Sequence, residues 1–170
     1  MHFFTLEKAD LKHIDGIIDV CTLGYRATYR EIYSKEYTDR IIRDFYNYDR
    51  ILKEVTIVNK NWGGDFVAIE DDNVIGAGAG GMLDDKNTEL FVLYLKPDRR
   101  GEGIGSKILH AISEQQKNSG AIKQYVSVQK ENKKGIPFYE AKGFSFLHEQ
   151  ESYANSDNDT YISLRYVREL

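Results

Sequence analysis

The sequence is poor in the residues that would support several common kinds of protein. Cysteine occurs once, as Cys21, which excludes a disulfide within the chain and a multi-cysteine zinc site. The longest unbroken apolar run, 90–95, has six residues, far below the roughly 20 residues that span a bilayer. The first residues form neither a basic segment nor a long apolar one, so we expect no signal peptide and a cytoplasmic protein.

Basic residues are also fewer than acidic ones. Lysine and arginine total 23 against 27 acidic residues, a net charge of -4, which gives no general attraction to nucleic-acid phosphates or anionic membranes. We therefore expect neither partner, and a cationic ligand fits better. The histidines show no metal-ligand spacing, so no metal site is predicted; they are His2, His13, His110 and His148.

Linkers and repeats are absent as well. The only prolines are Pro97 and Pro137, and no Gly/Ser-rich stretch interrupts the 170 residues. A hydrophobic content of 41% and a charged content of 29% are typical of globular proteins. We therefore predict a single domain over residues 1–170.

The spacing of apolar residues predicts the secondary structure. Helical spacing predicts one helix after Asp10, with Ile14, Ile17 and Cys21 on its buried stripe, and a second from about Ser34 to Val55. From residue 65 the period becomes two, and polar turns separate the segments, which predicts an antiparallel meander. The full prediction comprises a short apolar start at 3–6, strands at 66–70, 74–82, 88–95, 123–129, 144–149 and 160–167, and further helices ending near 118 and at 132–141. The expected fold is α/β (α+β), with a mixed, mostly antiparallel central sheet of about six to seven strands flanked by about four helices.

A glycine-rich loop, 99–105, runs from the end of a predicted strand into a helix. Such a loop exposes backbone N–H groups at the positive end of the helix dipole, an arrangement that binds phosphate oxygens. Glycines at alternate positions let the backbone approach a pyrophosphate closely, and Arg100 and Ser106 can add donors.

Three other interpretations compete for this loop. It ends Gly105-Ser106-Lys107, which fails the P-loop pattern that requires Gly-Lys-Ser/Thr. It reads Gly-x-Gly-x-Gly after a meander, which departs from the Gly-x-Gly-x-x-Gly of a dinucleotide fold. A structural turn without a ligand remains open from the loop alone.

Two motifs carry a resemblance to a known family. The segment Arg100-Gly101-Glu102-Gly103-Ile104-Gly105 fits the Arg/Gln-x-x-Gly-x-Gly/Ala signature of the GCN5-related N-acetyltransferases. The segment 132–144 resembles that family's Asn-x-x-Ala-x-x-Phe-Tyr-x-x-x-Gly-Phe element, with Gly135 in place of alanine and Pro137 two residues later. The element order around 88–144 is also similar, whereas the first 60 residues match only in outline.

The resemblance implies acetyl-coenzyme A as co-substrate, bound where strands 88–95 and 123–129 splay apart. Its pyrophosphate would lie on the N–H groups of 100–106, and its pantetheine arm would pair with the backbone of strand 88–95. The cofactor-binding residues expected from the resemblance are Leu93, Leu95, Arg100, Gly101, Gly103, Ile104, Gly105, Ser106, Asn132, Phe138 and Tyr139. Asn132 has an alternative role as a helix cap.

The resemblance also implies two catalytic residues. Tyr139 matches the family's usual general acid, and a phenol stays protonated at neutral pH; its alternative role is packing against the cofactor. Glu89 resembles the family's glutamate that accepts the amine proton, directly or through water, although an exposed turn glutamate would look the same. Alternation predicts that Glu89 shares one face with Phe91, Leu93 and Leu95.

The acceptor is expected to be a primary amine, on a polyamine-like small molecule or on a peptide. Tyr29, Tyr33, Asp157 and Asp159 could form an acidic, aromatic-lined pocket for it, or could be core tyrosines and a solvated loop. Direct transfer is preferred because Cys21 is expected to be a buried structural thiol. The alternative functions are a non-catalytic acyl-coenzyme A-binding regulatory module and a dinucleotide-dependent oxidoreductase, and family analogy suggests a homodimer.

Overall fold

The computed structural model describes residues 3–170 and contains one seven-stranded sheet, in the order β1-β2-β3-β4-β5-β7-β6. All neighbouring strands are antiparallel except β4 and β5, which are parallel. This confirms the predicted mixed, mostly antiparallel sheet. The strands are β1 (Thr5–Lys8), β2 (Asp65–Glu70), β3 (Asn73–Met82), β4 (Asn87–Leu95), β5 (Lys123–Gln129), β6 (Ser145–Glu151) and β7 (Ile162–Glu169).

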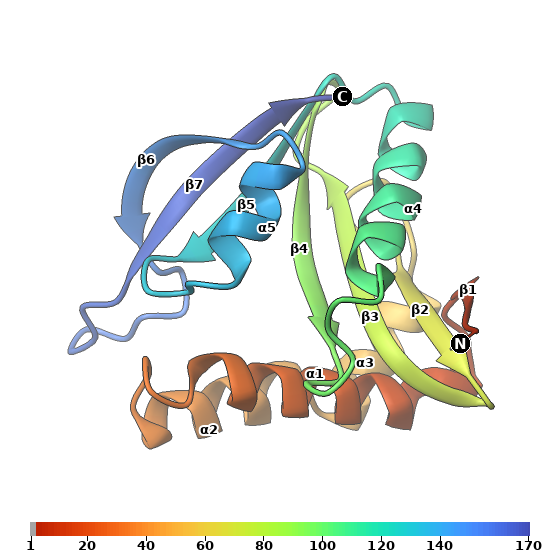
Figure 1. The fold of residues 1–170 in the computed structure, drawn as a ribbon, viewed down its shortest axis with the longest axis horizontal. Coiled ribbons are helices and arrows are strands. Elements are labelled where there is room, and N and C mark those ends of the chain that lie inside the picture. The colour runs from red at the N-terminus through yellow and green to blue at the C-terminus, as the bar shows by residue number, and fades with distance from the viewer. Residues whose placement is uncertain (1–2) are drawn as a thin grey trace.

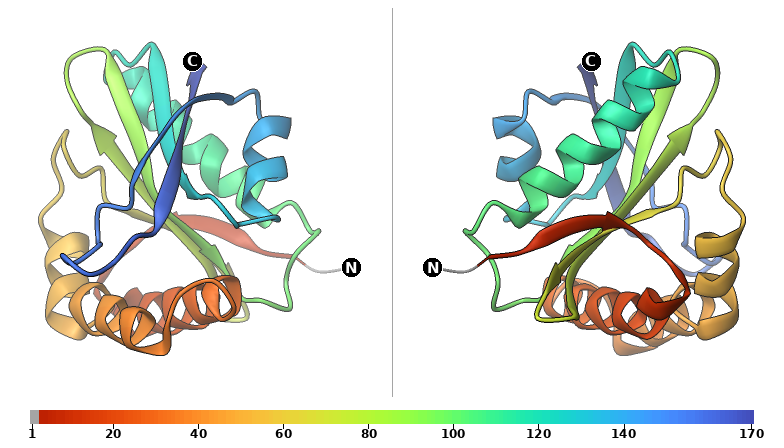
Figure 2. Two further views of the ribbon diagram at one scale, coloured as in Figure 1. Left: turned by 90° about the vertical axis from the view of Figure 1, so that its left-hand side faces the viewer. Right: turned by 90° about the vertical axis from the view of Figure 1, so that its right-hand side faces the viewer.

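Helices cover both faces of the sheet (Figure 1). Two lie on the face nearer the viewer, and the others lie below and behind the sheet (Figure 2). The front pair is α4 (Ile104–Asn118) and α5 (Gly135–Ala141); the others are α1 (Ile14–Tyr29), α2 (Lys35–Phe45) and α3 (Tyr48–Thr56), with a short 3-10 helix at Leu11–His13.

Each face of the sheet has its own hydrophobic core. On the front face, Ile108 and Ile112 of α4 pack with Leu90 and Val126. On the opposite face, the stripe of α1 predicted from the sequence packs with strand residues; the buried members are Ile14, Ile17, Val20, Cys21, Val67, Val74 and Ala77. Glycines in β3 let α4 approach closely, because a Cβ on Gly78 would lie 2.7 Å from Ile108.

The prediction of one helix from about Ser34 to Val55 is wrong in one respect, because this segment forms two helices, α2 and α3. Tyr46 leaves helical geometry at φ -119° and ψ 50°. Asn47 then caps α3 by accepting a hydrogen bond from the Arg50 N–H at 2.9 Å. Apolar residues keep helical spacing across the break, so periodicity alone does not reveal it.

β4 and β5 pair over only part of their length. Their ladder runs from Asn87 and Lys123 to Leu90 and Val126, after which the strands diverge toward α1 (Figure 1). An irregularity in the β3 ladder at the same level leaves Phe91 as an extra residue, since Ala79 faces Val92 and Gly80 faces Leu90. The splayed ends create the space that the site occupies.

Candidate active site

A cleft of about 820 Å³ lies between the diverging ends of β4 and β5. The end of α1 forms one wall, and α5 with the glycine loop forms another. Eight of the residues that the sequence singled out line this cleft. They are Tyr29, Leu93, Leu95, Arg100, Gly105, Asn132, Phe138 and Tyr139.

The edge of β4 presents unpaired backbone groups to the cleft. The Lys96 N–H donates to the Ile75 carbonyl of β3 at 2.9 Å. Because hydrogen-bonded residues alternate in an antiparallel ladder, Leu93 and Leu95 direct their N–H and C=O groups away from β3. Their partner on that side would be β5, which has diverged, so an extended ligand can take its place.

The glycine loop ends in a helix start without a side-chain cap. The N-cap of α4 is Gly103, at φ 80°, and over the described residues this cap makes no side-chain hydrogen bond and the first turn holds no acidic residue. Gly101 has φ 82°, and a Cβ on either glycine would meet nothing within 4 Å. The first N–H groups therefore face open space at the positive end of the helix dipole. Ile104 can contribute only its backbone, because its side chain is buried in the core.

An arginine that the sequence analysis missed anchors this loop. Arg99 binds both carboxylate oxygens of Glu70 at 2.8 Å and donates from Nε to Glu102 at 2.7 Å. The guanidinium thereby ties the loop to the end of β2 and leaves the next residue, Arg100, to line the cleft. The i,i+3 spacing of Arg99 and Glu102 was the only local signal of this anchor.

Tyr139, Tyr29 and Asn132 meet at the wall of the cleft formed by α5 and α1. Burial raises the pKa of the Tyr139 hydroxyl, and the nearby Tyr29 raises it further. Burial also raises the pKa of Tyr29, while hydrogen bonding with the side chains of Tyr94 and Asn132 opposes that rise. Both phenols therefore hold their protons at neutral pH.

Asn132 has the capping role considered for it and also lies in the lining of the cleft. Its Oδ1 accepts the Gly135 N–H at 2.9 Å and so caps the turn that begins α5, while its side chain also lines the cleft. A Cβ on Gly135 would lie 2.6 Å from the Asn132 amide nitrogen, which accounts for glycine at this position. α5 begins at Gly135, three residues later than the predicted start, and Pro137 lies in its first turn.

Glu89 does not share a face with Leu93 and Leu95, contrary to the expected alternation. The extra residue at Phe91 shifts the pattern, so that Leu90 joins those two leucines in the front core. The Glu89 carboxylate instead binds Nη2 of Arg165 on β7 at 2.9 Å, and each side chain is 16% exposed. Glu89 does not line the cleft, whereas its neighbours Leu90 and Phe91 do.

The other sequence candidates lie apart from the cleft lining. Tyr33 stacks on Tyr29 with ring centroids 4.7 Å apart and belongs to a cluster of buried tyrosines. Asp157 is exposed on the β6–β7 loop. Asp159 is bound by Arg40 at 3.1 Å. The structure therefore does not unite Tyr29, Tyr33, Asp157 and Asp159 in one acidic pocket.

Cys21 is a buried structural thiol, as predicted. It is 1% exposed in the core under α1, and burial raises its pKa well above the ordinary value, with Asp65 and Glu54 adding to the effect. Over residues 3–170, no group of three or more His, Cys, Asp or Glu side chains could hold a metal ion. In the same part of the chain, every helix is too short or too polar to cross a membrane.

Comparison with known proteins gives a consistent result. The sequence model of the acetyltransferase (GNAT) family matches residues 24–144. A spermidine N(1)-acetyltransferase of Thermoplasma acidophilum is 29% identical over 140 residues, which cover 82% of this chain and 86% of that protein. A thialysine N-epsilon-acetyltransferase of Bos taurus is 35% identical over 68 residues, which cover 40% of each chain.

Solved structures share the fold over nearly the whole chain. The PaiA N-acetyltransferase from Thermoplasma acidophilum, in complex with coenzyme A, has a TM-score of 0.81 at 24% identity and covers 96% of this chain and 98% of its own. The ribosomal-protein-S18-alanine N-acetyltransferase from Escherichia coli has a TM-score of 0.70 at 11% identity, over 98% of this chain and 94% of its own.

Proposed function

The chain belongs to the acetyltransferase (GNAT) family, and we propose that it transfers the acetyl group of acetyl-coenzyme A directly to a primary amine of a small, polyamine-like molecule. Acetyl-coenzyme A is the co-substrate of this class of N-acetyltransferase. The acceptor is proposed from the similarity to a spermidine N(1)-acetyltransferase over most of both chains. That relative and the thialysine acetyltransferases are enzymes, which gives no support to a non-catalytic binding module.

One observation carries the proposal: a single cleft joins the uncapped start of α4, the free edge of β4 and the protonated Tyr139. The open space around Gly101 and Gly103 fits a pyrophosphate, which would lie on the N–H groups of the loop and beside Arg100. Leu93 and Leu95 would pair with the amide groups of the pantetheine arm. Bound there, acetyl-coenzyme A supplies an activated thioester.

The residues of the chain would then handle two protons. Tyr139 holds a proton on Oη and would give it to the departing sulfur. Glu89, oriented by Arg165, would accept the proton of the attacking amine, directly or through water. A backbone N–H of the free β4 edge can donate to the acetyl oxygen as negative charge develops on it. Cys21 takes no part, because it is buried away from the cleft.

A thermal-shift titration tests the cofactor assignment directly. Acetyl-coenzyme A and coenzyme A should raise the melting temperature, whereas NAD should not, since only a ligand that binds the native state stabilises it. Stabilisation by NAD alone would contradict the proposal and favour the oxidoreductase interpretation. The cytoplasmic location and the homodimer remain predictions.

A further inference from the structure

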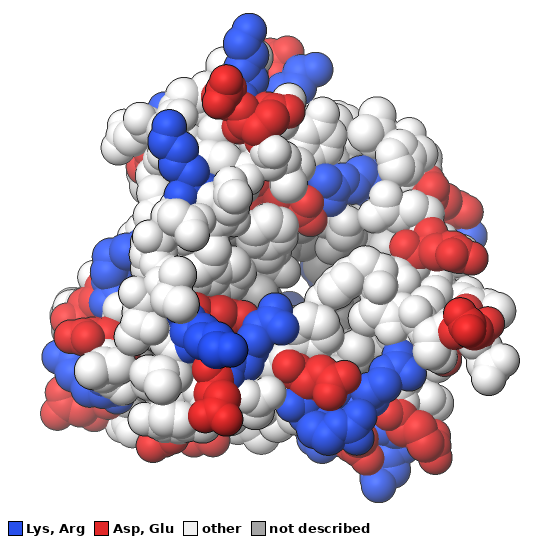
Figure 3. Space-filling model, turned by 180° about the vertical axis from the view of Figure 1, so that it is seen from behind, with Lys and Arg blue, Asp and Glu red and all other residues white. Residues whose placement is uncertain are grey.

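The face of the molecule opposite to that in Figure 1 is hollowed near its centre, with acidic and basic side chains around the rim (Figure 3). The β6–β7 loop, 152–161, lies on this side, close to α2 and α3 (Figure 2). Its Tyr153 ring contacts Phe45 of α2 edge to face, with centroids 5.9 Å apart, and yet Tyr153 is 82% exposed. Tyr153 therefore offers an aromatic ring to a ligand at this side of the molecule.

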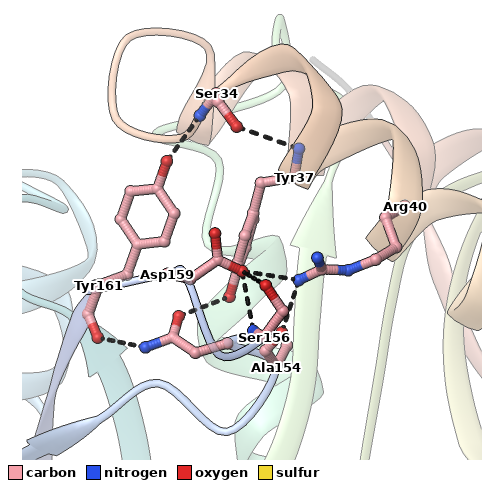
Figure 4. A network of polar contacts seen from close by, with 8 residues as sticks. Ser34, Tyr37, Arg40, Ala154, Ser156, Asp159 and Tyr161 are labelled. Atoms are coloured by element: carbon pink, nitrogen blue, oxygen red, sulfur yellow. Dashed lines mark hydrogen bonds and ion pairs between the residues drawn. The ribbon is translucent and has the colours of Figure 1, made fainter.

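The loop that carries Tyr153 is held in place by a network of polar contacts with α2 (Figure 4). Arg40 donates from Nη2 to the Ala154 carbonyl at 2.7 Å and to Asp159 at 3.1 Å. The Tyr37 hydroxyl donates to Asn155 at 3.4 Å. At the far end of the loop, the Ser34 N–H donates to the hydroxyl of Tyr161 at 2.8 Å. Arg40 therefore fixes the residue that directly follows Tyr153.

A continuous wall of side chains leads from Tyr153 to the cleft. The Arg50 guanidinium lies 4.8 Å from the centre of the Phe45 ring and binds Glu54 at 2.9 Å. The indole N–H of Trp62 donates to the Glu54 carbonyl at 2.8 Å. Trp62 in turn stacks on Phe91 at 6.1 Å, and Phe91 lines the cleft. Trp62 and Phe91 thus connect Glu54 to the lining of the cleft.

The Glu54 carboxylate supplies negative charge at this wall of side chains. Glu54 is 17% exposed, and over residues 3–170 its carboxylate is bound through Oε1 alone. Burial raises the pKa of Glu54, and the Arg50 ion pair only partly opposes this. Burial raises the pKa of Tyr153, Arg50 opposes this rise, and Glu54 and Glu89 add to it. A further cation near Oε2 of Glu54 would stabilise the charged form of that group.

We propose that Glu54 and Tyr153 form a subsite for the second ammonium group of an aliphatic diamine or polyamine, and that Arg40 positions Tyr153 for this role. The inference rests on the proposed function and names the residues that select the acceptor. Glu54 pairs with the distal ammonium, while the faces of Tyr153 and Trp62 contact the methylene chain and the charge. The proximal amine then reaches the cleft past Phe91.

The test compares two acceptors of equal length, 1,4-diaminobutane and 1-aminobutane, in steady-state kinetics of the purified protein. Glu54→Gln should raise KM for the diamine about tenfold and leave KM for the monoamine and for acetyl-coenzyme A unchanged. Asp49→Asn, on the exposed side of the same helix, is the matched control and should change none of these values.

Tyr153 and Arg40 are tested with graded variants. Tyr153→Ala should raise KM for the diamine, whereas Tyr153→Phe, which keeps the ring, should not. Arg40→Met should reproduce the effect of Tyr153→Ala without altering KM for acetyl-coenzyme A, and Arg40→Lys should partly restore it. If Arg40 has only a structural role, Arg40→Met should instead lower the melting temperature and should lower kcat for both amines.

Calorimetric titration of diamine into the complex with coenzyme A tests the subsite separately from the proposed function. Binding that Glu54→Gln weakens about tenfold supports the subsite even if no amine is acetylated, in which case only the proposed function fails. Absence of diamine binding to the wild-type complex overturns the subsite. Equal effects of Glu54→Gln on diamine and monoamine also overturn it.

Discussion

Glu89 and Arg165 form an ion pair at 2.9 Å across the sheet, although 76 residues separate them in the chain. Arg165 also donates to the Ser127 hydroxyl at 3.0 Å and lies over the Tyr125 ring, so its guanidinium is fixed on β5. The pair therefore holds the Glu89 carboxylate beside the point where β4 and β5 diverge.

Removal of the Glu89 carboxylate should slow the chemical step. We expect Glu89→Gln to lower kcat by roughly 10²- to 10⁴-fold, the usual contribution of a general base, while KM for acetyl-coenzyme A stays unchanged. Arg165→Met should lower kcat by a smaller factor, since it only orients the base. Steady-state kinetics check both variants, and an unchanged kcat in Glu89→Gln would show that another group accepts the proton.

The Tyr139 hydroxyl should matter for turnover and not for cofactor binding. Tyr139→Phe keeps the ring packed against Phe138 and Phe144 but removes the proton donor. We expect kcat to fall by roughly 10²- to 10⁴-fold with little change in the dissociation constant of coenzyme A. Pre-steady-state measurement of thiol release distinguishes this from slow product release. Full activity in Tyr139→Phe would assign the aromatic ring a packing role only.

The left-handed backbone at Gly103 should be needed for cofactor binding. A side chain at φ 80° is strained, and Gly103→Ala should shift the loop and raise KM for acetyl-coenzyme A. Gly120, at φ 96° after the far end of α4, provides a matched control. Gly120→Ala should lower the melting temperature to a similar extent while KM stays unchanged. Equal KM values in the two variants would argue against phosphate binding at the loop.

Asp65 should make the stability depend on pH. It is 3% exposed, and its Oδ2 has no hydrogen-bond partner among residues 3–170. Burial and the nearby Glu54 raise its pKa to about 8, against the opposing effect of Lys8. A carboxyl whose pKa is higher in the folded state destabilises that state as it ionises. The free energy of unfolding should therefore decrease as the pH rises from about 4 to about 8, by a few kcal/mol in order of magnitude.

Asp65→Asn removes the ionisable group and should flatten this dependence. Urea unfolding of both proteins across that pH range measures the difference. We expect the variant to be more stable than the wild type above about pH 8 and similar to it below about pH 5. A wild-type stability that rises over this range would contradict the assigned pKa shift.

The sequence predicted the parts of the site whose backbone geometry depends on local residues. Gly101 and Gly103 mark the left-handed turns before α4, and 132–144 marks the turn and helix that carry Tyr139. The apolar pattern also predicted the six strands β2 to β7, whereas β1 was not predicted as a strand. The prediction from alternation failed at Phe91, where β4 has an extra residue. Such a residue depends on how the partner strand packs, and a pattern with a period of two does not reveal it.

Contacts between distant segments were not predictable from the sequence. The Arg99–Glu70 and Arg165–Glu89 pairs join residues 29 and 76 positions apart, and no local pattern relates their partners. The Arg40 contacts with the β6–β7 loop are of the same kind. These pairs fix where the glycine loop, Glu89 and the β6–β7 loop lie, so the geometry of the site follows from the fold.

The most direct test of the account is an incubation of the purified protein with acetyl-coenzyme A and spermidine, followed by mass spectrometry of the amine and titration of free thiol. We expect acetylspermidine and coenzyme A in equal amounts, with neither formed by a variant that carries both Glu89→Gln and Tyr139→Phe. Thiol release without acetylated amine, or no reaction in a protein that binds coenzyme A, would contradict it.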